Sequence, residues 1–400
     1  MNRREFSRSA AGFAGLSLAS PSWANKPQAP APLQFYDAVP NLVPIRAHED
    51  RVFRVTVCLR PFRAQGPRLD VEKVGDKVVV HNYGHGGSGW SLSWGSSSIA
   101  VKKAMAAADG NRNVAVIGCG AMGLTSALLL QRAGARVTIY AKERPPDVRS
   151  SRATGSWTPD SRIALTASAP ASFGALWEEM ARTSYATYQS YLGLAGNPVE
   201  WTDRYFLSDT PAAELLAKRH EADPIGFAQY QSRISDIMPK GLDLPPGSHP
   251  FPLKYARRNS SMTFNVAAYS KQLMSEFLVE GGKLETAEFH SPADFRKLQE
   301  KVIIHATGYG ARALWKDESI IPVRGQIAWL IPQPGVDYGL TFGNFNVLGR
   351  RDGIVVQSNE QGEETGWKDD NEAVDRGEAD RAVQALAALY GAMGKQGRTE

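Results

Sequence analysis

Two glycine-rich stretches stand out in this 400-residue chain as places where the backbone itself can bind a ligand. The first runs from His81 to Trp94 and reads HNYGHGGSGWSLSW, and the second runs from Val114 to Leu130 and reads VAVIGCGAMGLTSALLL. Each is expected to form a tight turn that leads into a helix, so backbone N–H groups and the positive end of the helix dipole face one ligand. Two such anion-binding turns suit a long anionic cofactor, of which a flavin dinucleotide is the obvious candidate.

The second stretch has the pattern of a dinucleotide-binding βαβ unit. It predicts a strand from residue 114, the turn Gly118-x-Gly120-x-x-Gly123, a helix to residue 133 and another strand over 136–140. Glu143 stands 20 positions after Gly123, where an acidic side chain can bind the adenosine ribose, and Lys142 beside it is a candidate phosphate ligand. A plain surface charge remains the alternative for Glu143.

Arg60 is the candidate ligand for a carboxylate. The stretch VFRVTVCLRPFR, residues 52–63, begins with the alternation of a strand. Pro61 holds Arg60 in an extended conformation, and the guanidinium fork can donate two parallel hydrogen bonds to a carboxylate. An arginine at a strand end is more often a surface residue, so this assignment needs support from elsewhere in the chain.

That support comes from a resemblance. HNYGHGGSG resembles the signature near the chain end of the D-amino-acid oxidase family, and the turn at Gly118 resembles that family's opening. LRPFR is similar to the family's arginine-proline motif, KVIIHATGYG (301–310) to its second dinucleotide segment, and IPVRGQI (321–327) to its PxRGQI strand. The resemblance implies FAD as cofactor, Arg60 as the residue that binds the substrate carboxylate, and Gly87 as a residue bordering the flavin where reaction occurs.

The loop over 145–159 strengthens the preference for FAD over NAD, because Ser150, Ser151 and Arg152 match the family's loop that covers the pyrophosphate and the flavin ring. One departure is that Thr341 and Phe345 stand where the family has pocket tyrosines, so Tyr83 or Tyr255 are alternatives. The predicted cofactor-binding residues are Gly84, His85, Gly86, Gly87, Ser88, Gly89, Gly118, Gly120, Ala121, Met122, Gly123, Lys142, Glu143, Ser150, Ser151, Thr307 and Gly308.

The order of these motifs is reversed relative to the family, because the closing segment stands before the opening one. A connector of six residues, ADGNRN (108–113), joins them. A circular permutation explains this order, and the absence of a second HNYGHGG disfavours the rival, a duplicated piece. A permutation predicts that the end of the helix over 378–393 lies near the start of the strand at Arg51.

The first 24 residues read as an export signal. MNRREFSRS carries Arg3 and Arg4 ahead of Phe6, a twin-arginine pattern, and a short apolar run and a small-x-small site ending at Ala24 follow. We therefore expect passage through the twin-arginine export machinery, cleavage near Ala24 and a periplasmic location. A disordered basic start is the alternative.

Composition limits the remaining classes. The chain is 42% hydrophobic and 22% charged with a net charge of +5, and no run of lysine or arginine exceeds two residues, so nucleic acid is not an expected partner. Two cysteines, Cys58 and Cys119, build neither a metal site nor a disulfide framework. The expected partner is a small-molecule substrate, with no stable membrane insertion, and the oligomeric state stays open.

The fold class predicted from these patterns and the resemblance is α/β: a Rossmann-type FAD-binding domain with an interleaved α+β substrate domain built on a mixed sheet. Helices are expected over 91–108, 169–192, 267–280 and 378–393, and the stretch 201–264 is expected to be irregular with short strands at 254–256 and 261–264. The predicted domains are a signal peptide (1–24), a linker (25–50), the FAD-binding domain (51–165, permuted as 51–108 and 113–165 and completed by about 285–320 and 351–400) and the substrate domain (166–284 and 321–350).

The predicted activity is FAD-dependent oxidative deamination of a D-amino acid. The α-hydrogen would leave as hydride to the flavin, the imine would hydrolyse to a 2-oxo acid and ammonia, and oxygen would reoxidise the flavin to give hydrogen peroxide. The alternatives are an FAD-dependent amine or amino-acid dehydrogenase with another substrate or acceptor, a non-catalytic flavin-binding protein and, more remotely, an NAD-dependent dehydrogenase.

Overall fold

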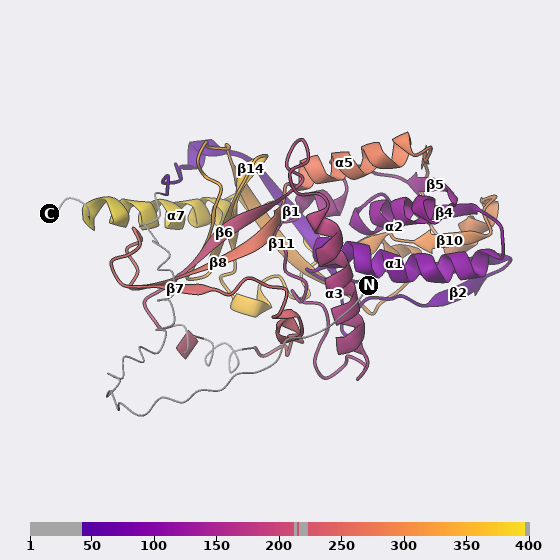
Figure 1. Cartoon of the computed structure of the whole chain (residues 1–400), viewed down its shortest axis with the longest axis horizontal. Coiled ribbons are helices and arrows are strands. Elements are labelled where there is room, and N and C mark those ends of the chain that lie inside the picture. The colour runs from indigo at the N-terminus through magenta and orange to yellow at the C-terminus, as the bar shows by residue number, and fades with distance from the viewer. Residues whose placement is uncertain (1–41, 212–213, 216–222, 397–400) are drawn as a thin grey trace, which may run out of the picture. The chain divides into compact units, whose positions relative to one another are not determined.

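Two β-sheets organise the chain, as the computed structural model in Figure 1 shows. The structure describes residues 42–211, 214–215 and 223–396. The predicted export signal and residues 25–41 of the predicted linker lie outside the described residues, so both stay predictions. Among the helices of the described ranges, none has the length and apolar character needed to cross a membrane.

The first sheet has six strands in the order β2-β3-β10-β4-β5-β9. All neighbours are parallel except the edge pair β2–β3. Its central strands are almost continuously apolar because helices and loops cover both faces. The strands are β2 (Val71–Val74), β3 (Lys77–His81), β4 (Asn113–Ile117), β5 (Arg136–Ala141), β9 (Lys283–Thr286) and β10 (Val302–His305).

Two strand–glycine turn–helix units stand on either side of β10 in this sheet. One is β3 followed by α1 (Gly89–Ala108), and the other is β4 followed by α2 (Ala121–Arg132); α1 and α2 pack side by side (Figure 1). The connector between the units turns back through Asp109 and Gly110, both at positive φ. α5 (Val266–Val279) packs on α2, and α3 (Phe173–Gln189) packs on α1.

The second sheet has eight strands in the order β1-β11-β14-β13-β12-β6-β8-β7. It is mixed, as predicted, because β12 and β6 are parallel whereas the other neighbours are antiparallel. α7 (Arg376–Gln396) covers one face, where its apolar residues share a core with β11 and β14. The strands are β1 (Val52–Arg63), β6 (Val199–Ser208), β7 (Leu242–Leu244), β8 (Tyr255–Phe264), β11 (Ile320–Leu330), β12 (Gly339–Phe342), β13 (Phe345–Arg350) and β14 (Gly353–Ser358).

Short helical turns complete the described elements. They are η1 (Glu49–Arg51), η2 (Arg149–Arg152), η3 (Gln231–Ile234), η4 (Pro292–Lys297), η5 (Gly308–Gly310), α6 (Ala311–Leu314) and η6 (Gly362–Glu364).

The α/β fold class and most predicted elements are present, but three details differ. β1 and β14 are strands of the eight-stranded sheet and α7 packs on it, although the sequence predicts all three for the FAD-binding domain. α5 packs on α2 and β9 is a strand of the six-stranded sheet, although most of their residues were predicted for the substrate domain. Strand alternation shows that one face is buried but not against which sheet. The stretch 201–264, expected to be irregular, contains β6 and β8, which pair from Val199–Phe264 to Ser208–Tyr255.

The end of α7 lies beside the segment that leads into β1. Ile45 and Leu389 share one hydrophobic core. The Tyr338 hydroxyl donates to the Val43 carbonyl at 2.7 Å and pairs with the Tyr390 hydroxyl at 2.6 Å. Residues 43–45 therefore lie beside the last turns of α7, whereas Glu49, two residues before Arg51, contacts Arg376 and Gln384 in the first half of that helix. The predicted adjacency is present for the segment that precedes Arg51, and the permuted order stays a prediction.

Candidate functional site

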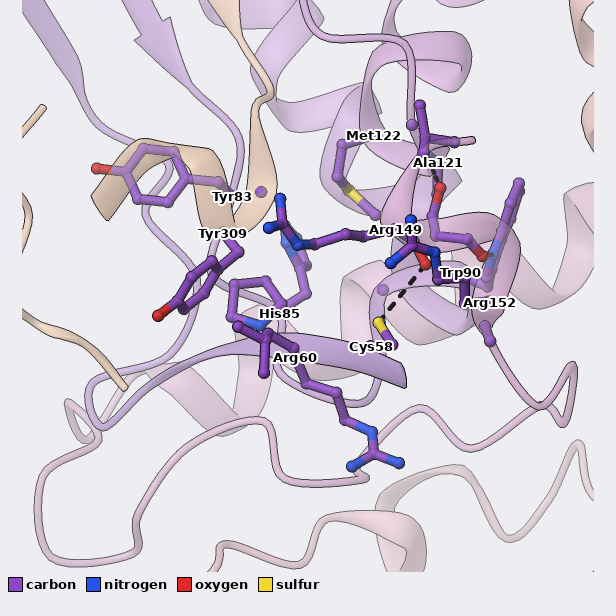
Figure 2. A pocket seen from close by; sticks show the side chains of 18 of the residues that line it. Cys58, Arg60, Tyr83, His85, Trp90, Ala121, Met122, Arg149, Arg152 and Tyr309 are labelled. Carbon is purple, nitrogen blue, oxygen red and sulfur yellow. Dashed lines mark hydrogen bonds between the residues drawn. The ribbon is translucent and has the colours of Figure 1, made fainter. Parts of the chain in front are cut away.

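A cavity of about 550 Å³ opens where the carboxyl ends of β3, β10, β4 and β5 face the eight-stranded sheet. Both glycine turns line it, and so does Arg60 of β1 (Figure 2). This position follows the general rule that ligands of open parallel sheets bind beyond the carboxyl ends of the strands.

The turn at Gly118 has the shape of a dinucleotide cradle. Gly118 has φ +108°, and a Cβ there would lie 2.5 Å from the Ala306 carbonyl oxygen of the neighbouring β10 turn. A Cβ on Gly123 would overlap the Gly118 carbonyl, so this glycine lets α2 approach β4. Ser150 closes the turn from outside by accepting a hydrogen bond from the Ala121 amide at 3.2 Å (Figure 2).

The turn after β3 is held against β1. The Gly86 amide donates to the Pro61 carbonyl at 2.9 Å, and the Gly87 amide donates to the Ser161 carbonyl at 3.0 Å. Gly86 has φ +54°, and a Cβ there would overlap the Arg162 carbonyl oxygen. These two N–H groups are therefore engaged within the protein, whereas the residues that begin α1 line the cavity.

The first turn of α1 suits an anionic or electron-rich ligand. It carries no acidic residue, and Gly89, Trp90 and Ser91 line the cavity. The Trp90 indole donates to the Ser150 carbonyl at 2.8 Å, which ties this helix start to the turn at Gly120 (Figure 2). Both helix dipoles thus point their positive ends into one cavity.

His85 is uncharged and links the turn after β3 to Ser96 of α1. Its Nε2 lies 2.7 Å from Ser96 Oγ, whose hydroxyl donates to Asn82 Oδ1 at 2.7 Å, so Nε2 is the donor to Ser96. Burial lowers the pKa of His85 to about 3 because a charged imidazole would lose its hydration there.

A second buried chain of hydrogen bonds connects the cavity with the protein surface. His305 Nε2 lies 2.7 Å from the Thr307 hydroxyl, the two Nδ1 atoms of His305 and His81 are 3.0 Å apart, and His81 Nε2 lies 3.1 Å from Glu72. Burial lowers the pKa of His81 to about 4, and burial lowers the pKa of His305 well below its ordinary value.

These three histidines predict a steep loss of stability in mild acid. Between about pH 4 and 6.5 the unfolded chain binds protons at His81, His85 and His305 that the folded chain does not bind. The free energy of unfolding should therefore fall as pH falls, by about 4 kcal/mol per pH unit near pH 5 for roughly three protons. Urea unfolding between pH 7 and 5, with FAD in excess, measures it.

The variant His85→Gln tests whether these histidines cause the dependence of the free energy of unfolding on pH. His85→Gln keeps a donor toward Ser96 and removes one titrating group, so the slope near pH 5 should fall by about one third. A slope that His85→Gln leaves unchanged would contradict the assignment.

Arg60 lies in the cavity with its positive charge available. Its Nη1 donates to the Arg324 carbonyl at 3.1 Å, and the guanidinium lies so close over Gly325 that a Cβ there would overlap it. Burial first, and then the charge of Arg162, lower the pKa of Arg60 to about 10, so it is protonated at neutral pH. Within the described residues no carboxylate pairs with Arg60.

Cys58, two residues before Arg60 on β1, anchors η2. Its thiol donates to the Arg149 carbonyl at 3.5 Å (Figure 2), and burial raises the pKa of this thiol. Arg152 donates to the Val57 carbonyl at 3.1 Å, while Arg149 pairs with Glu372 at 2.6 Å. Both cysteines are free thiols. The loop predicted to cover a pyrophosphate is thus fixed to β1.

The cavity gathers most of the predicted cofactor-binding residues. Three predicted residues do not line it: Ser88, Gly123 and Ser151. The Ser88 hydroxyl donates to the Ser161 carbonyl at 3.0 Å. Gly123 instead allows α2 to pack against the Gly118 carbonyl. The predicted residues that line it are Arg60, Gly84, His85, Gly86, Gly87, Gly89, Gly118, Gly120, Ala121, Met122, Lys142, Glu143, Ser150, Thr307 and Gly308.

The residues considered for the substrate pocket lie partly inside and partly outside the cavity. Thr341, Phe345 and Tyr255 do not line the cavity, whereas Tyr83 does, with its hydroxyl donating to Asp317 at 2.8 Å. The cavity is also lined by residues that no sequence pattern singled out: Trp90, Tyr309, Arg162, Arg204 and Asn346. A signal existed for Trp90, at the start of the helix after the glycines, but none for Arg204, which lies in the stretch expected to be irregular.

Comparison with known proteins agrees with this geometry. The family profile described as FAD dependent oxidoreductase matches residues 113–399. The D-amino-acid oxidase of Rubrobacter xylanophilus is 27% identical over 224 residues, 56% of this chain and 60% of that protein. The D-amino-acid oxidase of Dictyostelium discoideum is 26% identical over 221 residues, 54% of this chain and 56% of that protein.

A solved structure shows a similar fold. The iminodiacetate oxidase from Chelativorans sp. BNC1 superposes with a TM-score of 0.50 and 16% identity, covering 70% of this chain and 79% of that chain. The match to the two D-amino-acid oxidases spans about 60% of their length or less.

Proposed function

Because the chain belongs to the family of FAD-dependent oxidoreductases and FAD is its cofactor, we propose that it oxidises a D-amino acid to a 2-oxo acid, ammonia and hydrogen peroxide. One observation carries the proposal. Arg60, a half-buried arginine with no carboxylate partner in the described residues, lines the same cavity as the two glycine turns. The named activity of the D-amino-acid oxidase relatives supports it.

The residues of the cavity fit FAD. Gly118 and Gly123 allow α2, β4 and the turn after β10 to pack closely around the cradle. Ser150 and the start of α2 present polar groups suited to a pyrophosphate. Lys142 and Glu143 line the cavity beyond β5, where they would meet the adenosine ribose and phosphate. The first turn of α1 would face the flavin ring.

The chain's own part in the reaction is to bind and orient the substrate. Bound FAD supplies the acceptor for a hydride. Arg60 would hold the substrate carboxylate, and its bond to the Arg324 carbonyl fixes the guanidinium in place. The positive end of the α1 dipole favours the negative charge that develops when the hydride is transferred. The substrate amine must be neutral, and no dedicated side-chain base is required.

Anaerobic reduction of the bound flavin tests the proposal. The purified holoprotein is mixed with D- and L-amino acids without oxygen, and we expect loss of the oxidised flavin absorbance with D-amino acids only. Admission of oxygen should restore the absorbance and produce hydrogen peroxide. Reduction without peroxide would indicate a dehydrogenase with another acceptor, and a flavoprotein that no amine reduces would be a non-catalytic binder.

We infer in addition that the chain is a circular permutant of its family. Two observations support this inference. Only a short connector joins α1 to β4, and Ile45 shares a hydrophobic core with Leu389 of α7, so short links could join the ends in either order. The test reverses the order: the chain is opened between Gly110 and Asn111, and residue 396 is joined to residue 42 by a short linker.

The reordered protein should retain the flavin absorbance and the circular dichroism of the parent. A control opened between Gly120 and Ala121, inside the dinucleotide turn, should lose both. Failure of the reordered protein to fold while the parent folds would contradict the inference.

A further inference from the structure

We propose that Arg204 binds a second anionic group of the substrate, so that the preferred substrate is an amino acid whose side chain ends in a carboxylate. The inference rests on the proposed function, because it assigns the other end of the molecule that Arg60 holds.

Arg204 is a buried charge without a counter-charge. It stands on β6, lines the cavity and is only 8% exposed. Its Nη2 donates to Asn346 Oδ1 at 2.7 Å, its Nε has no hydrogen-bond partner, and within the described residues no carboxylate pairs with it. Burial lowers the pKa of Arg204 to about 10, which still leaves it protonated at neutral pH.

A charge in this state is costly to the folded protein. Desolvation of a guanidinium costs several kcal/mol unless an anion and further hydrogen bonds compensate it. A single neutral amide, Asn346, provides one such bond. An anionic ligand that enters the cavity would supply the missing partner for Nε and for the charge.

The two arginine heads lie over the same sheet, two strands apart, and both line the cavity. The Arg204 side chain crosses Gly339 of β12, where a Cβ would lie 3.1 Å from its Cγ, and it reaches Asn346 of β13. The Arg60 head lies over Gly325 of β11, and β14 is the one strand between β11 and β13.

This arrangement sets the size of the ligand. Two strand spacings across the sheet and about two residues along it separate the heads by about 12 Å. A guanidinium–carboxylate contact at each end, with N···O distances of about 2.8 Å, leaves room for an amino diacid of about four or five carbons.

The cavity wall next to Arg204 is polar, as a substrate side chain that ends in a carboxylate requires. Gln357 of β14 lines the cavity beside Asn346, to which it is paired in register. Arg149, by contrast, belongs to the loop at the dinucleotide turn and pairs with Glu372. Arg204 therefore stands apart from the groups that would contact the FAD pyrophosphate.

The first experiment compares substrates and a variant. In the holoprotein, D-aspartate and D-glutamate should reduce the flavin without oxygen at a kcat/KM at least 10-fold higher than D-alanine does. Arg204→Met should lower kcat/KM for the two diacids about 100-fold and change that for D-alanine only a few-fold. An equal loss for all three substrates would overturn the inference.

A second variant keeps the arginine and supplies a carboxylate within the protein. In Asn346→Asp the new side chain would pair with Arg204, so the preference for diacids should disappear while the guanidinium remains. Retention of the wild-type preference in Asn346→Asp would overturn the inference.

A binding measurement separates this inference from the proposed oxidation. Succinate, which carries no amine and cannot be deaminated, should perturb the absorbance of the bound flavin in the wild type, with a Kd at least 10-fold weaker in Arg204→Met. If no amino acid reduces the flavin but succinate binds through Arg204, the oxidase assignment fails and the subsite stands. If D-alanine reduces it and neither succinate nor a D-diacid binds, the subsite is excluded.

Discussion

Arg60→Met is expected to lower kcat/KM for every amino acid that the protein oxidises by roughly 10³-fold. If Arg60 binds the substrate carboxylate as proposed, the variant removes two charge-assisted hydrogen bonds, each worth about 1.5–3 kcal/mol. The loss should also fall on kcat, because the carboxylate contact fixes the α-carbon relative to the flavin. Stopped-flow reduction of the flavin without oxygen measures both constants.

Two further variants delimit this prediction. Arg60→Lys should recover part of the rate, because an ammonium keeps the charge but not the planar fork. Arg54→Met changes another arginine of β1, whose guanidinium lies 4.3 Å from the Trp329 ring, away from the cavity, and should leave the rate unchanged. Wild-type activity in Arg60→Met would remove Arg60 from the substrate site.

Gly123→Ala is expected to abolish retention of FAD during purification. Its Cβ would overlap the Gly118 carbonyl, so α2 must move away from β4 and the turn loses its shape. Overpacking of this kind costs about 1–3 kcal/mol of stability, and the displaced helix start weakens cofactor binding further. We expect the Kd for FAD to rise by roughly 100-fold, measured by flavin fluorescence quenching.

Gly391→Ala is the control for this second prediction. Gly391 lies in α7, and a Cβ there meets nothing within 4 Å, so the variant should bind FAD as the wild type does. Gly123→Ala with unchanged FAD affinity would show that the close approach of α2 to β4 is dispensable.

The two glycine-turn units could be predicted from the sequence because their information is local. A buried apolar run, glycines at fixed offsets and a helix pattern follow one another within about twenty residues in each unit. The backbone geometry then restricts what can replace Gly118 or Gly86, and the structure places both turns at one cavity. Arg60 was found through its motif, since its strand alone resembles many others.

Other features depend on contacts that sequence patterns do not encode. Gly87 was predicted to border the flavin, and no sequence pattern indicated that its N–H would donate to the carbonyl of Ser161, which lies 74 residues later in the chain. Arg204 was missed because most residues that alternate with it on its side of β6 (Glu200, Thr202 and Ser208) are polar, so the sequence lacks the apolar alternation that marks a strand. The assignment of β1 and β14 to a sheet likewise depends on partners distant in the sequence.

The position of β10 between β3 and β4 affects the order in which the protein can fold. β3 and β4 flank it on either side and do not pair with each other, although both are synthesised some 200 residues earlier. Until residue 305 has left the ribosome, β3 and β4 lack the strand that joins them, and each exposes an unpaired edge. We therefore expect flavin to bind at a late stage of folding, after β10 has paired with β3 and β4.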